Sequence, residues 1–282
     1  MENVLRTLIY NNQVSLTIAD TTALTQEGIR LHQLAPASAR LFGKALSIMT
    51  FMSACLKEKK GEISFSVKGN GLGGEICVSG NFDMRIRGYI QNPSLQDVCE
   101  EDCLGHDGDI TVVRQDGYSR PFVGACALAQ SGKIDEAFEE YYAISEQLPT
   151  YIATIVELDE EGKCEFSGVC VLQPLPFAEQ TTLEDMPKGE ALYEIVKQVK
   201  QLGIQETAKG VFSAEEDKIQ LCQAEYKCNC SRSYLTGVIV TLGEAQLREM
   251  IREDGQISLH CHYCNSDYVF NEQDIDKIFP KG

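Results

Sequence analysis

Four cysteines near the C-terminus constrain this chain more than any other feature. They form a close pair, Cys228 and Cys230, and after thirty intervening residues a second pair, Cys261 and Cys264. Two close pairs of thiols, brought together across a short folded insert, make a tetrahedral four-sulfur site, and soft thiolates in that geometry favour zinc. The spacing therefore predicts one Zn²⁺ per chain, held by these four cysteines.

The predicted zinc site has no open position for a substrate. Four protein ligands fill the coordination shell, which argues against zinc-catalysed hydrolysis. His260 and His262 flank Cys261, but in an extended segment they point to the face opposite Cys261. We therefore expect both histidines to be surface side chains, and we assign no catalytic residue.

Three functions remain open at this point. A constitutive zinc adaptor or nucleic-acid binder is disfavoured because residues 226–282 contain six Lys or Arg and eight Asp or Glu, without the expected basic excess. A thiol–disulfide oxidoreductase is disfavoured because the 261–264 pair ends an apparent strand instead of opening a helix that would lower a thiol pKa. A redox switch is permitted because zinc-bound thiolates are targets for oxidants when accessible.

Composition limits the class of protein. The chain has 282 residues, 43% of them hydrophobic, a formal net charge of −17 and twelve cysteines. Its first residues lack the basic start and apolar run of a secretory signal, and no run of about 18 apolar residues could span a membrane. Many cysteines in such a chain indicate a reducing compartment. We expect a cytoplasmic protein with neither a membrane nor a nucleic acid as its partner.

The other eight cysteines carry weaker signals. Four of them lie among apolar residues, where small buried side chains are expected; these are Cys55, Cys77, Cys126 and Cys170. Cys99 and Cys103 occur in an acidic stretch, so we expect them at the surface, where they could form a second redox pair. Cys222 precedes the zinc module and is a candidate reactive thiol. The sequence assigns no role to Cys99, Cys103 or Cys222.

Hydrophobic patterning predicts an α+β protein with three parts. A large N-terminal domain of mixed sheet and helix covers 1–178, a partly helical linker covers 179–225, and a small C-terminal zinc-binding domain covers 226–282. Strands are expected at 4–10, 13–19, 63–68, 75–79, 84–91, 109–114, 122–127, 151–158, 165–173 and 237–241, and helices at 22–33, 37–56, 134–148, 190–202 and 244–253. Residues 204–225 receive no assignment.

Several motifs together resemble one family. The segments Tyr226–Arg232, Leu242–Gly243, Ile251–Gly255 and His260–Cys264, with Tyr268 and Phe270, are similar to the redox domain of heat shock protein 33, the bacterial redox-regulated chaperone. Upstream similarity includes His32–Pro36, Leu41–Leu46, Arg87–Pro93 and Ser145–Pro149. The chain departs from the family pattern at Leu104–Ile110, which lacks the usual glycine-rich turn, and at 71–74, which lacks the common Gly-Pro pair.

The resemblance implies an ATP-independent holdase, not an enzyme. In the family the reduced, zinc-bound form is inactive. Oxidation would form the disulfides Cys228–Cys230 and Cys261–Cys264 and release zinc. The C-terminal module and the linker would then unfold and expose apolar surface that binds unfolding client proteins under oxidative stress. The oxidised form commonly dimerises.

Energetics are consistent with that order of events. A structural zinc contributes roughly 10–16 kcal/mol of apparent binding energy in small zinc peptides. A disulfide within either close pair closes a tiny loop and restrains the unfolded chain little, and the CxC pair would be strained. Exchanging the metal for two local disulfides should therefore unfold the module. The sequence does not assign the surface that binds client proteins. The apolar face of the helix at 190–202 is either part of that surface or an ordinary interdomain contact.

Overall fold

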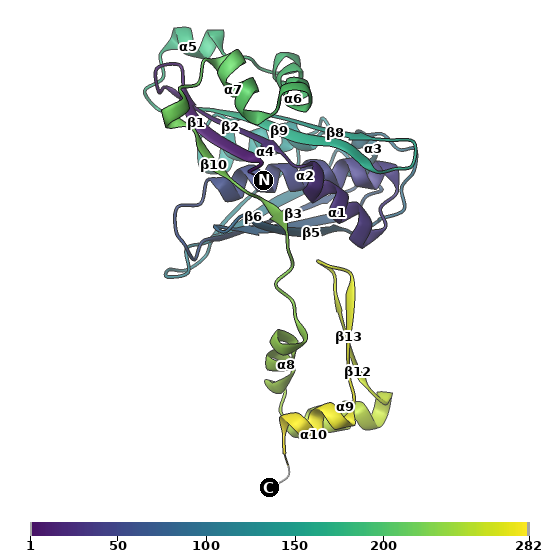
Figure 1. Ribbon diagram of the computed structural model, residues 1–282. Coiled ribbons are helices and arrows are strands. Elements are labelled where there is room, and N and C mark those ends of the chain that lie inside the picture. Colours follow the sequence, from purple (N-terminus) through teal and green to yellow (C-terminus); the bar gives the residue numbers. More distant parts are fainter. Residues whose placement is uncertain (1, 281–282) are drawn as a thin grey trace. The chain divides into compact units, whose positions relative to one another are not determined.

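The computed structural model describes residues 2–280 (Figure 1). The chain divides into two compact units, Met1–Lys227 and Cys228–Gly282, each with a hydrophobic core of its own. Within residues 2–280, none of the helices combines the length and apolar character needed to traverse a bilayer.

The larger unit alternates hairpins with helices. Its elements are β1 (Val4–Ile9), β2 (Val14–Asp20), α1 (Thr22–His32), α2 (Pro36–Ala54), β3 (Glu62–Gly69), β4 (Glu75–Asn81), β5 (Arg85–Ile90), α3 (Glu100–Leu104), β6 (Gly108–Gln115), β7 (Phe122–Ala127), α4 (Ile134–Tyr141), the π-helix η1 (Tyr142–Glu146), β8 (Tyr151–Leu158), β9 (Cys164–Pro174), α5 (Gln180–Asp185), α6 (Glu190–Leu202), α7 (Ile204–Phe212), the 3₁₀ turn η2 (Glu216–Lys218), β10 (Gln220–Cys222) and β11 (Glu225–Tyr226). The strands predicted between residues 4 and 173, and the helices predicted at 22–33, 37–56 and 190–202, are confirmed to within a few residues.

Two sheets enclose a central helix in this unit. Within residues 2–280, one sheet has the order β10-β1-β2-β9-β8 and the other the order β11-β5-β4-β3-β6-β7. Helix α2 contacts strands of both sheets, and Figure 1 shows it between them. Its 19 residues are buried on nearly all sides, because the helix is apolar around most of its circumference. The main core therefore fills the space between the two sheets.

Helices α5, α6 and α7 cover the outer face of the five-stranded sheet (Figure 1). Apolar residues on one face of α6 and α7 pack against apolar side chains of β1, β2 and β9, as expected of amphipathic helices. The contributing residues include Leu192, Ile195, Val196 and Val199 of α6, Ile204, Ala208 and Phe212 of α7, and Leu5, Leu16, Ile18 and Leu172 of the sheet. The segment predicted as a linker thus belongs to the larger compact unit.

The smaller unit is a hairpin with three short helices. Its elements are α8 (Arg232–Val240), α9 (Glu244–Asp254), β12 (Ile257–Cys261), β13 (Ser266–Phe270) and α10 (Glu272–Ile278). The helix predicted at 244–253 is confirmed by α9.

The strand predicted at 237–241 is wrong, because these residues continue helix α8 up to Val240. The β-branched run Val238-Ile239-Val240 favours a strand locally. The Ser231 hydroxyl, however, accepts a hydrogen bond from the Tyr234 N–H at 3.1 Å and caps the helix, and Ile239 is buried in the small core. Capping and burial override the local preference.

A buried carboxylate joins α6 to the rest of the larger unit. Asp135 of α4 is 1% exposed and accepts hydrogen bonds from the Thr154 N–H at 2.9 Å and the Thr154 hydroxyl at 2.6 Å. The Tyr193 hydroxyl of α6 donates a third bond to Asp135 at 2.8 Å. The apolar contacts of α6 are not directional, whereas this bond fixes the helix at one position on the unit.

Replacing Tyr193 tests this anchor. In Tyr193→Phe, Asp135 loses one of its donors, so we expect the free energy of unfolding to fall by about 1–2 kcal/mol. Urea unfolding followed by circular dichroism measures the change. Tyr118→Phe, which alters a 72% exposed tyrosine, is the matched control and should leave stability unchanged. An equal loss in both variants would contradict the assignment.

Glu139 gives this region a pH dependence. Burial, together with the charges of Asp135 and Glu136, raises the pKa of Glu139 to about 7, against the opposing effect of the Ile152 N–H, which donates to Glu139 at 2.7 Å. Glu139, Lys188 and Tyr193 line one surface pocket at the start of α6. Because the folded-state pKa lies above the value of 4.5 for a free glutamate, the folded protein holds this proton more tightly than the unfolded chain.

We expect this contribution to stability to be complete below the unfolded-state pKa and lost as pH rises through the folded-state pKa of about 7. Since Glu139 is partly solvated, the effect should be about 1 kcal/mol. Unfolding of the wild type and of Glu139→Gln is compared across this range. The variant, which is always uncharged, should gain stability relative to the wild type on the alkaline side. A difference that does not vary with pH would rule the explanation out.

Candidate metal centre

The smaller unit brings the four predicted cysteines together. The Sγ atoms of Cys228, Cys230, Cys261 and Cys264 all lie within 4.8 Å of one another. The Cys228–Cys261 sulfur pair is separated by 3.7 Å and the Cys230–Cys264 pair by 3.0 Å. Tetrahedral zinc with Zn–S bonds of about 2.3 Å requires S–S separations of about 3.8 Å. The donor set and its spacing therefore fit a four-coordinate zinc ion, with small adjustments.

Local backbone structure places each pair. Cys228 and Cys230 immediately precede the capped start of α8, and the Cys230 N–H points to the Cys228 sulfur at 3.5 Å. Cys261 ends β12, and Cys264 follows in the turn to β13, where its N–H donates to the Cys261 carbonyl at 3.3 Å. Asn265 completes this turn in the left-handed conformation, with φ of 53°. A helix start and a hairpin turn thus converge on one cluster.

Tyr268 of β13 lies beside the sulfur cluster, with its hydroxyl 3.2 Å from the Cys230 sulfur. Burial works to raise the pKa of Cys230, but hydrogen bonds with Tyr268 and Cys264 outweigh it and lower the pKa to about 7. Burial raises the pKa of Cys264 to about 11 and holds that of Cys228 well above its usual range. A bound zinc ion would hold all four as thiolates, so binding must release protons. Sequence reasoning assigned no role to the Tyr268 hydroxyl.

The histidines lie outside this cluster, as the alternation of side chains along a strand predicts. Both are exposed, and the imidazole Nδ1 of His260 lies 2.7 Å from Asp267. Among the described residues, the group of side chains that could hold a metal ion contains the four cysteines alone.

The core that supports the metal centre is small. Within residues 228–280, the buried apolar side chains are Ile239, Leu247, Ile257, Phe270 and Ile275. Arg232 braces the hairpin, since its guanidinium stacks on Phe270 at 4.4 Å and pairs with Asp274 at 2.7 Å. Units of this size rarely supply enough hydrophobic stabilisation without a metal or a disulfide.

The remaining cysteines are free thiols. Cys170 is buried as expected, while Cys55, Cys77 and Cys126 are only partly buried. Cys99 is exposed, but the expectation that Cys103 is exposed is wrong, because Cys103 forms part of the main core. Burial raises the pKa of Cys103 to about 11, which disfavours its thiolate and its reactivity.

The fold and site define a class: an α+β protein with a large two-sheet unit and a small four-cysteine unit. Comparisons with known proteins agree. A family model described as Hsp33 protein matches residues 2–271. The 33 kDa chaperonin of Alkaliphilus oremlandii is 30% identical over 287 residues, covering 98% of this chain and 95% of that protein. The 33 kDa chaperonin of Bacillus pumilus is 28% identical over 287 residues, covering 99% and 98%.

The fold has a solved counterpart. The crystal structure of the 33 kDa chaperonin, a heat shock protein 33 homologue from Thermotoga maritima, matches with a TM-score of 0.82 at 22% identity, covering 98% of this chain and 97% of that one. The predicted α+β fold class is confirmed. The chain belongs to the Hsp33 family, as its motifs predict.

Substitution of the ligands tests the metal centre. We expect each of Cys228→Ser, Cys230→Ser, Cys261→Ser and Cys264→Ser to weaken zinc binding by more than about 100-fold, and Tyr268→Phe to weaken it by about tenfold through loss of an outer hydrogen bond. Competition with a chromogenic chelator gives the affinities. The control is Cys222→Ser, a partly buried cysteine of β10 outside the cluster, which should retain one zinc per chain. Loss of zinc in that control would contradict the assignment.

Proposed function

We propose that this protein is a redox-regulated, ATP-independent holdase chaperone of the cytoplasm and not an enzyme. In the reduced state Cys228, Cys230, Cys261 and Cys264 hold one Zn²⁺ per chain, and the protein is inactive. Under oxidative stress it binds unfolding client proteins and prevents their aggregation. Membership of a family whose relatives are named chaperonins supports the chaperone role, and the four-sulfur cluster supports the regulation.

One observation carries the proposal: four cysteine sulfurs lie close together in a unit whose core has only five buried apolar residues. Bound zinc supplies charge neutralisation and a fixed tetrahedral geometry for the four thiolates. Without it, the small core alone has to hold residues 226–282 together, which favours their opening.

Two molecules of peroxide would oxidise the four cysteine thiolates. One peroxide accepts two electrons from the thiolates of Cys228 and Cys230, and with two protons leaves as two waters while one S–S bond forms. A second peroxide does the same at Cys261 and Cys264. All four ligands are consumed, so zinc leaves. Each new disulfide closes a loop of three or four residues and restrains the unfolded chain little.

Loss of zinc would affect the three parts of the chain differently. We propose that 1–178 is a permanent core, that 179–225 is a linker whose attachment depends on the metal-bound module, and that 226–282 is the switch. The apolar contacts of α6 and α7 with the five-stranded sheet support this, because detachment of the linker would uncover apolar surface on both partners. Such surface suits unfolding clients, and would also favour association of two oxidised chains into a homodimer.

The test combines three measurements on the zinc-loaded protein during peroxide treatment at mildly raised temperature. We expect zinc release, unfolding of residues 226–282 by hydrogen exchange, and suppression of client aggregation to rise together, with peptide mapping placing the disulfides at 228–230 and 261–264. Cys222→Ser should behave as the wild type.

Different results of this experiment would indicate one of the two alternative functions. An oxidoreductase would reduce a test disulfide catalytically while remaining folded, and a constitutive adaptor would lose its activity along with its zinc. A chaperone activity equal before and after oxidation would overturn the regulatory part of the proposal.

A further inference from the structure

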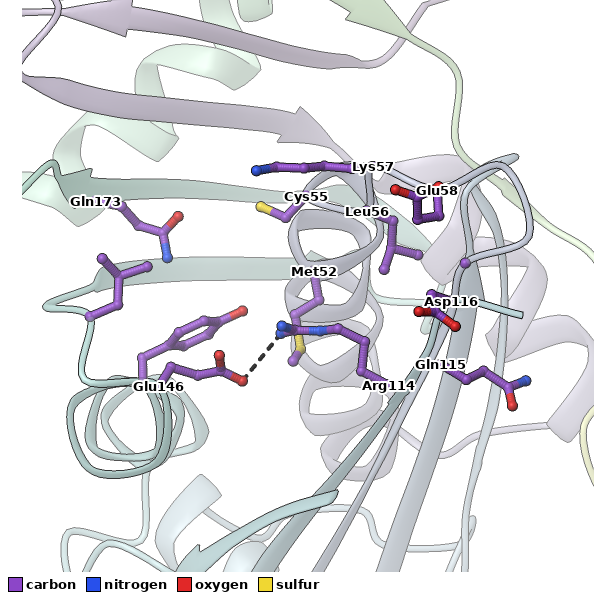
Figure 2. A pocket seen from close by; sticks show the side chains of 13 residues that line it. Met52, Cys55, Leu56, Lys57, Glu58, Arg114, Gln115, Asp116, Glu146 and Gln173 are labelled. Carbon is purple, nitrogen blue, oxygen red and sulfur yellow. Dashed lines mark hydrogen bonds and ion pairs between the residues drawn. The ribbon is translucent and has the colours of Figure 1, made fainter. Parts of the chain in front are cut away.

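The larger unit contains a cavity of about 410 Å³ beyond the C-terminal end of α2 (Figure 2). Four segments form its walls: the end of α2 with the loop that follows it, the end of β6, the π-helix η1 and the end of β9. The volume is within the range of small-molecule sites. Every lining residue belongs to the unit Met1–Lys227, so the cavity is independent of the metal centre.

Two cationic side chains line this cavity. Lys57 comes from the loop after α2, and Figure 2 shows the Arg114 guanidinium reaching in from β6. Arg114 donates to Glu146 at 3.2 Å through one of its nitrogens, which leaves its other N–H groups available. Among residues 2–280, no carboxylate lies within ion-pair distance of Lys57.

Two nearly buried polar groups also face the cavity. Tyr142 is 4% exposed, and within residues 2–280 its hydroxyl has no hydrogen-bond partner. Gln173 is 8% exposed, and its Nε2 donates to the Thr150 hydroxyl at 3.0 Å, which leaves the carbonyl oxygen of its side chain toward the cavity. The hydroxyl oxygen of Tyr142 is accessible from the cavity, so it is available to a ligand atom there.

The backbone is unusual at the same place. The sequence predicts one helix over 134–148, but α4 ends at Tyr141 and the chain continues as the π-helix η1. Such segments are rare and are frequent at functional sites. Here the π-helix supplies both Tyr142 and Glu146 to the cavity wall. The Tyr142 ring packs at a tilt against Phe51 and edge-on against Tyr141, with ring centroids 5.6 Å and 5.5 Å apart.

The charges of the lining select the ligand. Asp116 is occupied by the Ser119 hydroxyl and by the N–H groups of Tyr118 and Ser119. Figure 2 shows Asp116 and Glu58 at the end of the cavity away from Gln173. The whole lining holds two cations, Lys57 and Arg114, and three carboxylates, Glu58, Asp116 and Glu146. At the end nearer Gln173 only Lys57, Arg114 and Glu146 are charged, so the local sum there is one positive charge. This matches a monoanion better than a doubly charged phosphate.

We propose that this cavity binds a small monocarboxylate with a short apolar tail. Lys57, Arg114 and the Tyr142 hydroxyl bind the carboxylate, and the side chains of Met52 and Leu148 contact the tail. Binding of the monocarboxylate is separate from the proposed redox switch and does not depend on it.

The probes are octanoate and its uncharged counterpart octanamide, titrated by calorimetry into the zinc-loaded full-length protein. We expect octanoate to bind saturably at one site per chain, and octanamide to bind about tenfold or more weakly because it lacks the charge-assisted bonds. Lys57→Gln should weaken octanoate binding about tenfold and leave octanamide binding unchanged. Lys57 is exposed, so this variant does not threaten folding.

Two further variants sharpen the test. Lys59→Gln, which alters a nearby exposed lysine outside the cavity, is the matched control and should bind octanoate as the wild type does. Tyr142→Phe should weaken octanoate binding, with its melting temperature checked in parallel. Equal binding of octanoate and octanamide, equal effects at Lys57 and Lys59, absence of saturable binding, or a preference for inorganic phosphate would each overturn the proposal.

Discussion

Four cysteine sulfur atoms lie within 4.8 Å of one another in the C-terminal unit, and we propose that a metal ion between them keeps this unit folded. Unlike hydrophobic packing, this interaction requires a bound cation, because thiolates are held together only through a cation between them. The core of this unit has five buried apolar residues, and units of this size rarely fold on hydrophobic burial alone. The larger unit is different, since its central helix is enclosed by two sheets and its core is large. On the proposed function, one chain combines a permanent fold with a fold that depends on its metal.

Strong local periodicity made most of the larger unit predictable. The buried helix α2 and the hairpin of β8 and β9 have sequence patterns that only one secondary structure satisfies. The cluster of Cys228, Cys230, Cys261 and Cys264 was predictable for another reason, since ligand spacing is set by the metal and not by the surrounding fold. Their role as zinc ligands stays a prediction.

The elements that the sequence did not predict, or predicted wrongly, also have physical explanations. Residues 204–225 received no assignment, although 204–212 form helix α7. The strands β10 and β11 that follow it are two or three residues long and depend on pairing with β1 and β5, so they give no local pattern. The strand expected at 237–241 is helical because a cap at Ser231 and burial of Ile239 act from outside the run. The π-helix and the bond between Tyr193 and Asp135 depend on partners far along the chain, which no local pattern records.

The short strands β10 and β11 have a further consequence. They occupy the outer edges of two different sheets, β10 beside β1 and β11 beside β5, within seven residues of chain. Peeling this one segment away would leave two strands at once with rows of unpaired amide and carbonyl groups. Exposed sheet edges of this kind can pair with an extended polypeptide through backbone hydrogen bonds, which do not depend on its side chains. A single short piece of backbone therefore conceals two templates for strand addition.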